Sequence, residues 1–268
     1  MELTVNGHRT FCYTGGKVFD TAKPTAVFIH GVLNDHSVWI LQARYFAHHG
    51  WNVLAIDLPG HCKSAGPPPA SVEEAARFIV ALLDAAGVAK AALIGHSFGS
   101  LIALEVAGRT PERVSQLVMV GTAYPMKVSP ALLDMSRVEP RHAIDRVNVF
   151  SHSMLAPPPS MLGPGTWLYG GAKALMRRVL ASNPQGQLFY TGFKACDSYV
   201  GGDSAMEAVI CEVLFVLGRN DQMTLPKSAQ GLINKARKGK VVLLDAGHAV
   251  MSEAPDQTLF AMRDFLRP

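Results

Sequence analysis

Four short apolar runs in the first half of the chain have the length and composition of strands covered on both faces. They span residues 25–30, 52–56, 91–95 and 114–120. Segments with the apolar spacing of amphipathic helices separate them, at 37–49, 71–87 and 97–109. This alternation predicts right-handed crossovers and a parallel sheet with helices on both faces, which is an α/β fold.

The ends of the chain extend this pattern, and its middle interrupts it. An Asn6-Gly7 turn between 3–5 and 9–13 predicts an N-terminal hairpin. Strands at 211–218 and 240–244 and helices at 227–236 and 257–266 resume the alternation. The segment 123–205 has no buried-strand run, but contains Pro157-Pro158-Pro159 and helical pieces such as 172–180. We therefore expect a core formed by 1–122 and 206–268, with 123–205 inserted as a cap.

Composition limits which cellular location and which binding partners the sequence predicts. Hydrophobic residues make up 49% of the 268 residues, enough for a large core, and charged residues only 17%. The net charge of +4 is spread along the chain, and the basic run 235–240 is typical of a solvated helix end, so nucleic-acid binding is not expected. Secretory-signal features and the ~20 apolar residues of a membrane span are both missing from the sequence. Cys12, Cys62, Cys196 and Cys211 have neither metal nor disulfide spacing, which predicts a cytoplasmic protein.

The pentapeptide Gly95-His96-Ser97-Phe98-Gly99 fits the nucleophile-elbow pattern G-x-S-x-G. A predicted strand precedes it and a predicted helix follows at once, which is the context that this motif requires. The sharp turn would push the Ser97 hydroxyl out above the sheet, beside a helix N-terminus that favours negative charge. The sequence therefore predicts that Ser97 is a nucleophile.

A serine hydroxyl needs a base, and the base needs an orienting partner. His248 follows the strand 240–244, and Asp221 follows the strand 211–218. Both side chains would lie at the carboxyl edge of the sheet together with Ser97, where open α/β sheets bind ligands. The order Ser, Asp, His along the chain is that of the α/β hydrolases. Residues 121–125 contain no carboxylate, which favours Asp221 as the acid.

On these residues the chain resembles the α/β-hydrolase fold family, in its cap-containing, esterase-like branch. His30-Gly31 and Glu253-Ala254-Pro255-Asp256 agree with family patterns, as does the segment from Asp57 to Ser64, except that Cys62 replaces an expected glycine. The resemblance implies a mostly parallel eight-stranded sheet flanked by helices, with an inserted, mainly helical cap. It also implies that the backbone N–H groups of Val32 and Phe98 form an oxyanion hole.

Other polar residues near the motifs are expected to have supporting roles. We expect His30 and His96 to pack beside the site, Asp57 to serve a turn, and Asp245 to end a strand in solvent. The ten histidines form no ligand motif, so neither a metal nor a cofactor is expected.

These features predict a serine hydrolase that cleaves carboxylic esters, or related thioesters and amides, through an acyl-enzyme. Serine at position 97 disfavours the dehalogenases and epoxide hydrolases of this fold, which use aspartate there. The small-molecule substrate should be small to medium and apolar, because the cap is rich in Met and aromatic residues, namely Met126, Met135, Met154, Met161, Trp167, Tyr169, Phe189, Tyr190 and Phe193. The alternatives are a cofactor-free haloperoxidase or perhydrolase and, from another class, a hydrolase-like ligand receptor or scaffold. The sequence leaves the oligomeric state open.

Overall fold

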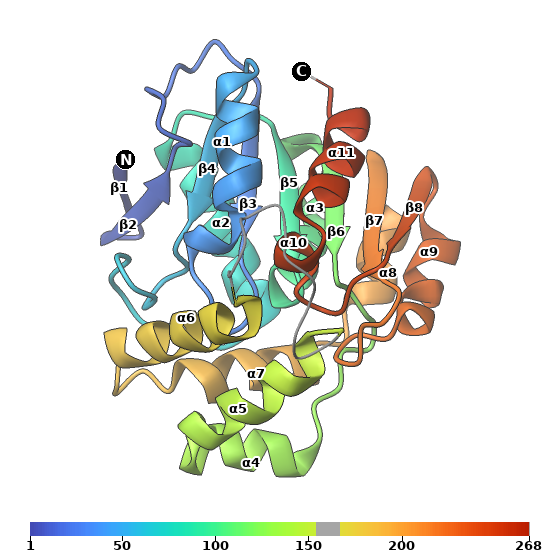
Figure 1. The fold of residues 1–268 in the computed structure, drawn as a ribbon. Coiled ribbons are helices and arrows are strands. Elements are labelled where there is room, and N and C mark those ends of the chain that lie inside the picture. The colour runs from blue at the N-terminus through green and yellow to red at the C-terminus, as the bar shows by residue number, and fades with distance from the viewer. Residues whose placement is uncertain (154–166, 268) are drawn as a thin grey trace.

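A computed structural model describes residues 1–153 and 167–267, and within them one eight-stranded sheet is found (Figure 1). The strand order is β1-β2-β4-β3-β5-β6-β7-β8; β1 and β2 pair antiparallel, β2 pairs antiparallel with β4, and the other pairs are parallel. The mostly parallel α/β-hydrolase sheet expected from the sequence is thus confirmed. The strands are β1 Glu2–Val5, β2 His8–Tyr13, β3 Thr25–Ile29, β4 Asn52–Ile56, β5 Ala91–His96, β6 Val114–Val120, β7 Glu212–Gly218 and β8 Gly239–Leu244.

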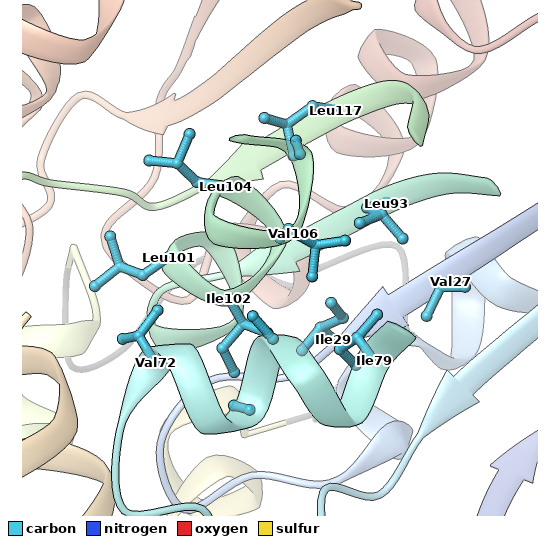
Figure 2. Close-up of a cluster of buried hydrophobic side chains, with 14 of the residues drawn as sticks. Val27, Ile29, Val72, Ile79, Leu93, Leu101, Ile102, Leu104, Val106 and Leu117 are labelled. Atoms are coloured by element: carbon cyan, nitrogen blue, oxygen red, sulfur yellow. The ribbon is translucent and has the colours of Figure 1, made fainter. Parts of the chain in front are cut away.

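Successive residues of a strand point to opposite sides of the sheet, so a continuous apolar strand presents apolar side chains on both faces. Helices cover both of these faces. Ile29, Leu93 and Leu117 face one layer, and Phe28, Ile94 and Val118 face the other. The first layer consists of α2 Val72–Ala85, α3 Phe98–Arg109, α8 Gly202–Ala208 and α9 Gln230–Lys235, and the second of α1 Ile40–His48, α10 Val250–Glu253 and α11 Pro255–Phe265. Figure 2 shows Ile102 of α3 and Ile79 of α2 packed near Ile29.

Helix ends follow the local sequence. The Ser71 hydroxyl accepts a hydrogen bond from the Glu74 N–H at 3.1 Å and so caps α2, while Gly87 beyond its end has a φ of +67°. The expected helix 37–49 divides into a 3₁₀ turn, His36–Trp39, and α1, because the Asp35 carboxylate accepts from the Ser37 N–H and starts the turn one residue early. Further 3₁₀ turns are Pro111–Arg113 and Pro226–Ala229.

Among the described residues, four helices lie beside the sheet, below it in Figure 1, and we propose that they form the cap. They are α4 Pro130–Val138, α5 Pro140–Ser151, α6 Leu168–Ser182 and α7 Leu188–Ser198, and they share a hydrophobic cluster that includes Ile144, Val179 and Phe189. The expected boundary at residue 205 falls inside α8. A Cβ on Gly108 would lie 2.6 Å from the Ala205 Cα, so α8 packs tightly on α3. We therefore propose that the cap ends before α8.

Over the described ranges, none of the helices has both the length and the apolar character needed to cross a membrane.

Candidate active site

Ser97 lies between β5 and α3, at the sharp turn predicted from its motif. Its φ of +52° is a conformation that non-glycine residues seldom adopt. The two flanking glycines explain how the turn fits. A Cβ on Gly95 would lie 2.1 Å from the Gly99 carbonyl oxygen, and a Cβ on Gly99 would lie 2.3 Å from the Ile29 carbonyl oxygen. The G-x-S-x-G spacing is therefore a steric requirement of this chain.

Asp221 and His248 meet in the loops after β7 and β8. The His248 Nδ1 lies 2.8 Å from the Asp221 Oδ2 and 3.0 Å from the Thr224 Oγ1. The Thr224 hydroxyl donates its proton to the Asp221 Oδ2 at 2.7 Å, so it can only accept from the imidazole. Two acceptors therefore face Nδ1 and fix its proton there, which leaves a lone pair on Nε2.

The Asp221 carboxylate is held as an anion. Its other oxygen accepts the backbone N–H groups of Met223 and Thr224, each at 2.8 Å. Burial by itself would raise the pKa of Asp221, but the adjacent His248 and the hydrogen bonds from Thr224 outweigh it and lower the pKa below its ordinary value. An ionised Asp221 is the form that orients an imidazole.

Ser97 and His248 line the same two cavities. The larger has a volume of about 320 Å³ and the smaller about 250 Å³, and Val32, Phe193 and Met223 also border both. The larger extends between the cap and the core along Leu175, Met176 and Phe189, and the smaller along Met126, Val128 and Leu132. A molecule bound at Ser97 thus has two mainly apolar spaces open to it.

The backbone N–H groups of Val32 and Phe98 stay a prediction as the two donors of an oxyanion hole. Phe98 is the first residue of α3, so its N–H has no acceptor within the helix. Within residues 1–153 and 167–267, neither N–H has a hydrogen-bond acceptor. Val32 occupies a turn in which the Asn34 N–H donates to the Gly31 carbonyl at 3.3 Å and Leu33 has a φ of +55°.

Comparison with known proteins agrees with the observed fold. A sequence profile of the α/β-hydrolase fold matches residues 24–154, which span β3 to α5 and include the Ser97 turn. This chain has the α/β-hydrolase fold. The enol-lactonase from Burkholderia xenovorans LB400 superposes over 99% of both chains with a TM-score of 0.83, at 21% identity.

Curated relatives of this α/β-hydrolase align over shorter segments. The dihydrolipoyllysine-residue acetyltransferase component of an acetoin cleaving system from Pseudomonas putida is 38% identical over 98 residues, which is 36% of this chain and 26% of that protein. The lipase LipV of Mycobacterium tuberculosis is 33% identical over 119 residues, 44% of this chain and 41% of the lipase. The alignments thus span less than half of these relatives.

The two histidines beside the site hold its backbone in place. The His96 Nε2 donates to the His248 carbonyl at 2.9 Å, and burial lowers the pKa of His96 to about 3. The His30 Nδ1 donates to the Gly31 carbonyl at 2.8 Å, while its Nε2 accepts from the Leu58 N–H at 3.1 Å. Burial lowers the pKa of His30 as well, so both rings are neutral. Through these contacts, His30 and His96 support the backbone of the loops around the site.

Asp57 and Asp245 lie where the sequence placed them. The buried Asp57 carboxylate accepts from the backbone N–H groups of His36 and Lys63, at 2.9 and 3.1 Å, and so holds the loop after β4. Asp245 is exposed after β8 and accepts from the Asn220 side chain at 2.9 Å.

Cys62 stands where the family pattern has a glycine, and the chain still forms the turn at this position. Its φ of +44° is a conformation that the expected glycine adopts freely and a cysteine adopts at a cost. The thiol donates to the Asp35 Oδ2 at 3.4 Å, and the backbone N–H donates to the Ser182 hydroxyl of the cap at 3.1 Å. Burial and the neighbouring Asp35 raise the pKa of the Cys62 thiol to about 12, so it is protonated at neutral pH.

One group of potential metal ligands lies nearby. Atoms of Asp35, His36 and Asp57 lie within 4.8 Å of one another. Those atoms already have protein partners, because the Arg178 guanidinium donates to Asp35 at 2.6 Å and the His36 ring lies 2.7 Å from Asp57. The group therefore forms an internal hydrogen-bond network, and the absence of a metal stays a prediction.

The cap residues expected to form the pocket divide into two sets. Met126, Phe189 and Phe193 line the cavities, whereas the described lining excludes Met135, Trp167, Tyr169 and Tyr190. Met154 and Met161, like Pro157-Pro158-Pro159, lie outside the described residues. Sequence reasoning missed Thr224, whose backbone N–H donates to the same Asp221 oxygen as the Met223 N–H of the local Asx turn. It also missed Met223, which borders both cavities and follows no motif.

Proposed function

We propose that this chain is a serine hydrolase that cleaves carboxylic esters through an acyl-enzyme intermediate. One observation carries this proposal. His248 has its Nδ1 proton fixed by Asp221 and Thr224 and lines, together with Ser97, both cavities at the carboxyl edge of the sheet. The names of a lipase and an enol-lactonase among similar proteins support ester chemistry.

The proposed reaction has two halves. The Ser97 oxygen attacks the acyl carbon while its proton passes to the His248 Nε2, and the Val32 and Phe98 N–H groups donate to the new oxyanion. Collapse of the tetrahedral intermediate breaks the bond to the alcohol, which takes the proton from His248 and leaves. His248 then removes a proton from water, and the resulting hydroxide attacks the acyl-enzyme. In a second collapse the bond between the acyl carbon and the Ser97 oxygen breaks, His248 returns its proton to that oxygen, and the acid is released.

The two cavities support the proposed substrate class. An ester held at Ser97 has an acyl side and an alcohol side, and each can occupy one cavity. Volumes of about 250 and 320 Å³ and mainly aliphatic, Met and Phe linings suit small to medium apolar groups. Thioesters and amides would react through the same groups. No step requires a cofactor, and the cytoplasmic location stays a prediction that fits four unpaired cysteines.

The proposal is tested with an acyl-chain series of activated esters and thioesters, with and without labelling by a serine-directed phosphonate. We expect Ser97→Ala to fold, to resist the phosphonate, and to lose at least about a thousandfold in kcat/KM. Ser198→Ala is the control, because among the described residues the Ser198 hydroxyl donates only to a carbonyl of its own helix. Folded Ser97→Ala with parental activity would refute the proposed nucleophile.

Two further assays separate the alternatives. Peroxide-dependent halogenation that exceeds ester hydrolysis would favour a haloperoxidase or perhydrolase. Tight ligand binding with less than one turnover per site would favour a receptor or scaffold. The size of the two cavities favours ester substrates over the small acid and peroxide of a perhydrolase.

A further inference from the structure

The larger cavity contains a buried polar atom that the proposed reaction does not use. His152, the residue after α5, lines this cavity together with Ser97 and His248 and is only 2% exposed. Its Nε2 has no hydrogen-bond partner among the described residues. Buried polar atoms in folded proteins are nearly always paired, so an unpaired one beside a ligand cavity indicates that a ligand supplies the partner.

The ring can offer one kind of hydrogen bond to such a ligand. The His152 Nδ1 lies 2.9 Å from the backbone carbonyl oxygen of Asn148. A carbonyl only accepts, so the proton of the neutral imidazole is on Nδ1. The Nε2 atom, on the other side of the ring, therefore presents a lone pair. Its partner must be a donor, such as a hydroxyl or an N–H.

The position of His152 is fixed relative to the reacting groups. The carbonyl of Ser151 accepts from the Ala249 N–H at 2.9 Å, directly after His248. On the other side, the Ser153 N–H donates to the Glu253 carboxylate at 2.9 Å, and the same carboxylate accepts from the Gly247 N–H at 3.0 Å. His152 is thus tied on both sides to the loop that carries His248.

We propose that His152 determines specificity by accepting a hydrogen bond from a hydroxyl or N–H on the part of the substrate that fills the larger cavity. The inference rests on the proposed function and narrows it: the preferred esters carry a donor group away from the reacting carbonyl. The rest of that part is apolar, because Leu168, Leu175, Met176 and Phe189 line the same space.

The experiment compares matched esters that differ by one terminal hydroxyl. Straight-chain and ω-hydroxy acids of about four to eight carbons, as p-nitrophenyl esters, probe the acyl side, and acetates of the matching alcohols and diols probe the other. We expect at least one hydroxylated series to be preferred about tenfold in kcat/KM, chiefly through KM. His152→Phe should remove the preference, because the substrate hydroxyl loses the His152 Nε2 as its acceptor. Plain esters have no such hydroxyl and should react within about threefold of the parent.

Two variants distinguish a role of His152 in substrate recognition from a merely structural role. His152→Gln keeps an acceptor oxygen and should restore part of the preference. Met176→Leu changes the lining of the same cavity by a volume-conserving swap and should leave the preference unchanged. The inference is overturned if the parent shows no preference at any chain length, or if folded His152→Phe keeps it.

Binding to Ser97→Ala distinguishes failure of this inference from failure of the proposed function. Calorimetric titration of the same esters onto that variant needs no turnover. Tighter binding of hydroxylated esters without hydrolysis by the parent would refute the proposed function and support the inference. Hydrolysis by the parent without any hydroxyl preference would support the proposed function and refute the inference.

Discussion

Thr224 shows how one hydroxyl can select the tautomer of a neighbouring base. Because its proton is donated to Asp221, its oxygen is left to accept from the His248 Nδ1. The imidazole therefore carries its proton on the side away from Ser97, and its Nε2 is ready to take one. Asp221 alone would orient the ring, but the second acceptor removes the freedom of the ring to tilt.

Replacement of Thr224 by valine should slow catalysis without unfolding the protein. We expect kcat for ester hydrolysis to fall about ten- to a hundredfold, with little change in KM, because a hydrogen bond to a charged group contributes about 1.5–3 kcal/mol. Steady-state kinetics on a p-nitrophenyl ester measures the change. Thr258→Val is the matched control, because Thr258 is also buried and its hydroxyl donates to the Val250 carbonyl at 3.2 Å. Equal losses of kcat in the two variants would contradict the assigned role.

The connection from β5 to α3 depends on close backbone contact at both of its glycines. The start of α3 lies against the carbonyl end of β3, as the contact of Gly99 with the Ile29 carbonyl shows. This contact brings the Phe98 N–H to the end of β3, from which the turn that carries Val32 departs. The geometry of the proposed oxyanion hole is thus set by how closely one helix approaches one strand.

Gly99→Ala should therefore be far more destabilising than an alanine in an open helix position. Its Cβ would lie 2.3 Å from one backbone carbonyl oxygen and 2.7 Å from the next, and backbone atoms cannot move aside cheaply. We expect a loss of at least about 3 kcal/mol in the free energy of unfolding, measured by urea denaturation. Gly231→Ala in α9 meets nothing within 4 Å and should be neutral or stabilise by up to about 1 kcal/mol. Comparable values for both variants would refute the steric argument.

The core could be predicted from the sequence because each buried strand is a continuous apolar run. The candidate site could be predicted because Ser97, Asp221 and His248 each follow the end of a predicted strand. The cavity lining could not be predicted in the same way. Leu175 and Met176 in α6 have the same apolar spacing as Val179, which packs inside the cap. Which of them faces the core depends on contacts between distant segments, and local periodicity does not encode those. His152 has no motif and became visible only through its unpaired atom.

Contacts between α6 and the core loops position the cap. The Arg178 guanidinium donates to the Asp35 carboxylate at 2.6 Å, and the Asn183 amide donates to the Gly60 carbonyl at 3.1 Å. Asp35 also lies in the loop that follows Val32, so one carboxylate joins the cap to the proposed oxyanion turn. Burial by itself would raise the pKa of Asp35, but hydrogen bonds from Ser37 and from Arg178 outweigh it and lower the pKa to about 2.

Arg178→Met should shift the acid unfolding of the molecule. A carboxyl group whose pKa is lowered by folding stabilises the folded state above its unfolded pKa, and this contribution is lost as pH falls through the folded pKa. For Asp35 that window runs from about 4 down to about 2. Without the guanidinium the folded pKa rises, so circular dichroism should place the acid unfolding midpoint at a higher pH. The loss of stability at neutral pH should be about 1 kcal/mol, because the arginine is largely exposed. Arg177→Met is the control, since the ion pair of the neighbouring Arg177 within the described part of the chain is a 3.5 Å contact with the half-exposed Asp145. An equal shift in both variants would mean that the Arg178–Asp35 pair does not hold the cap on the core.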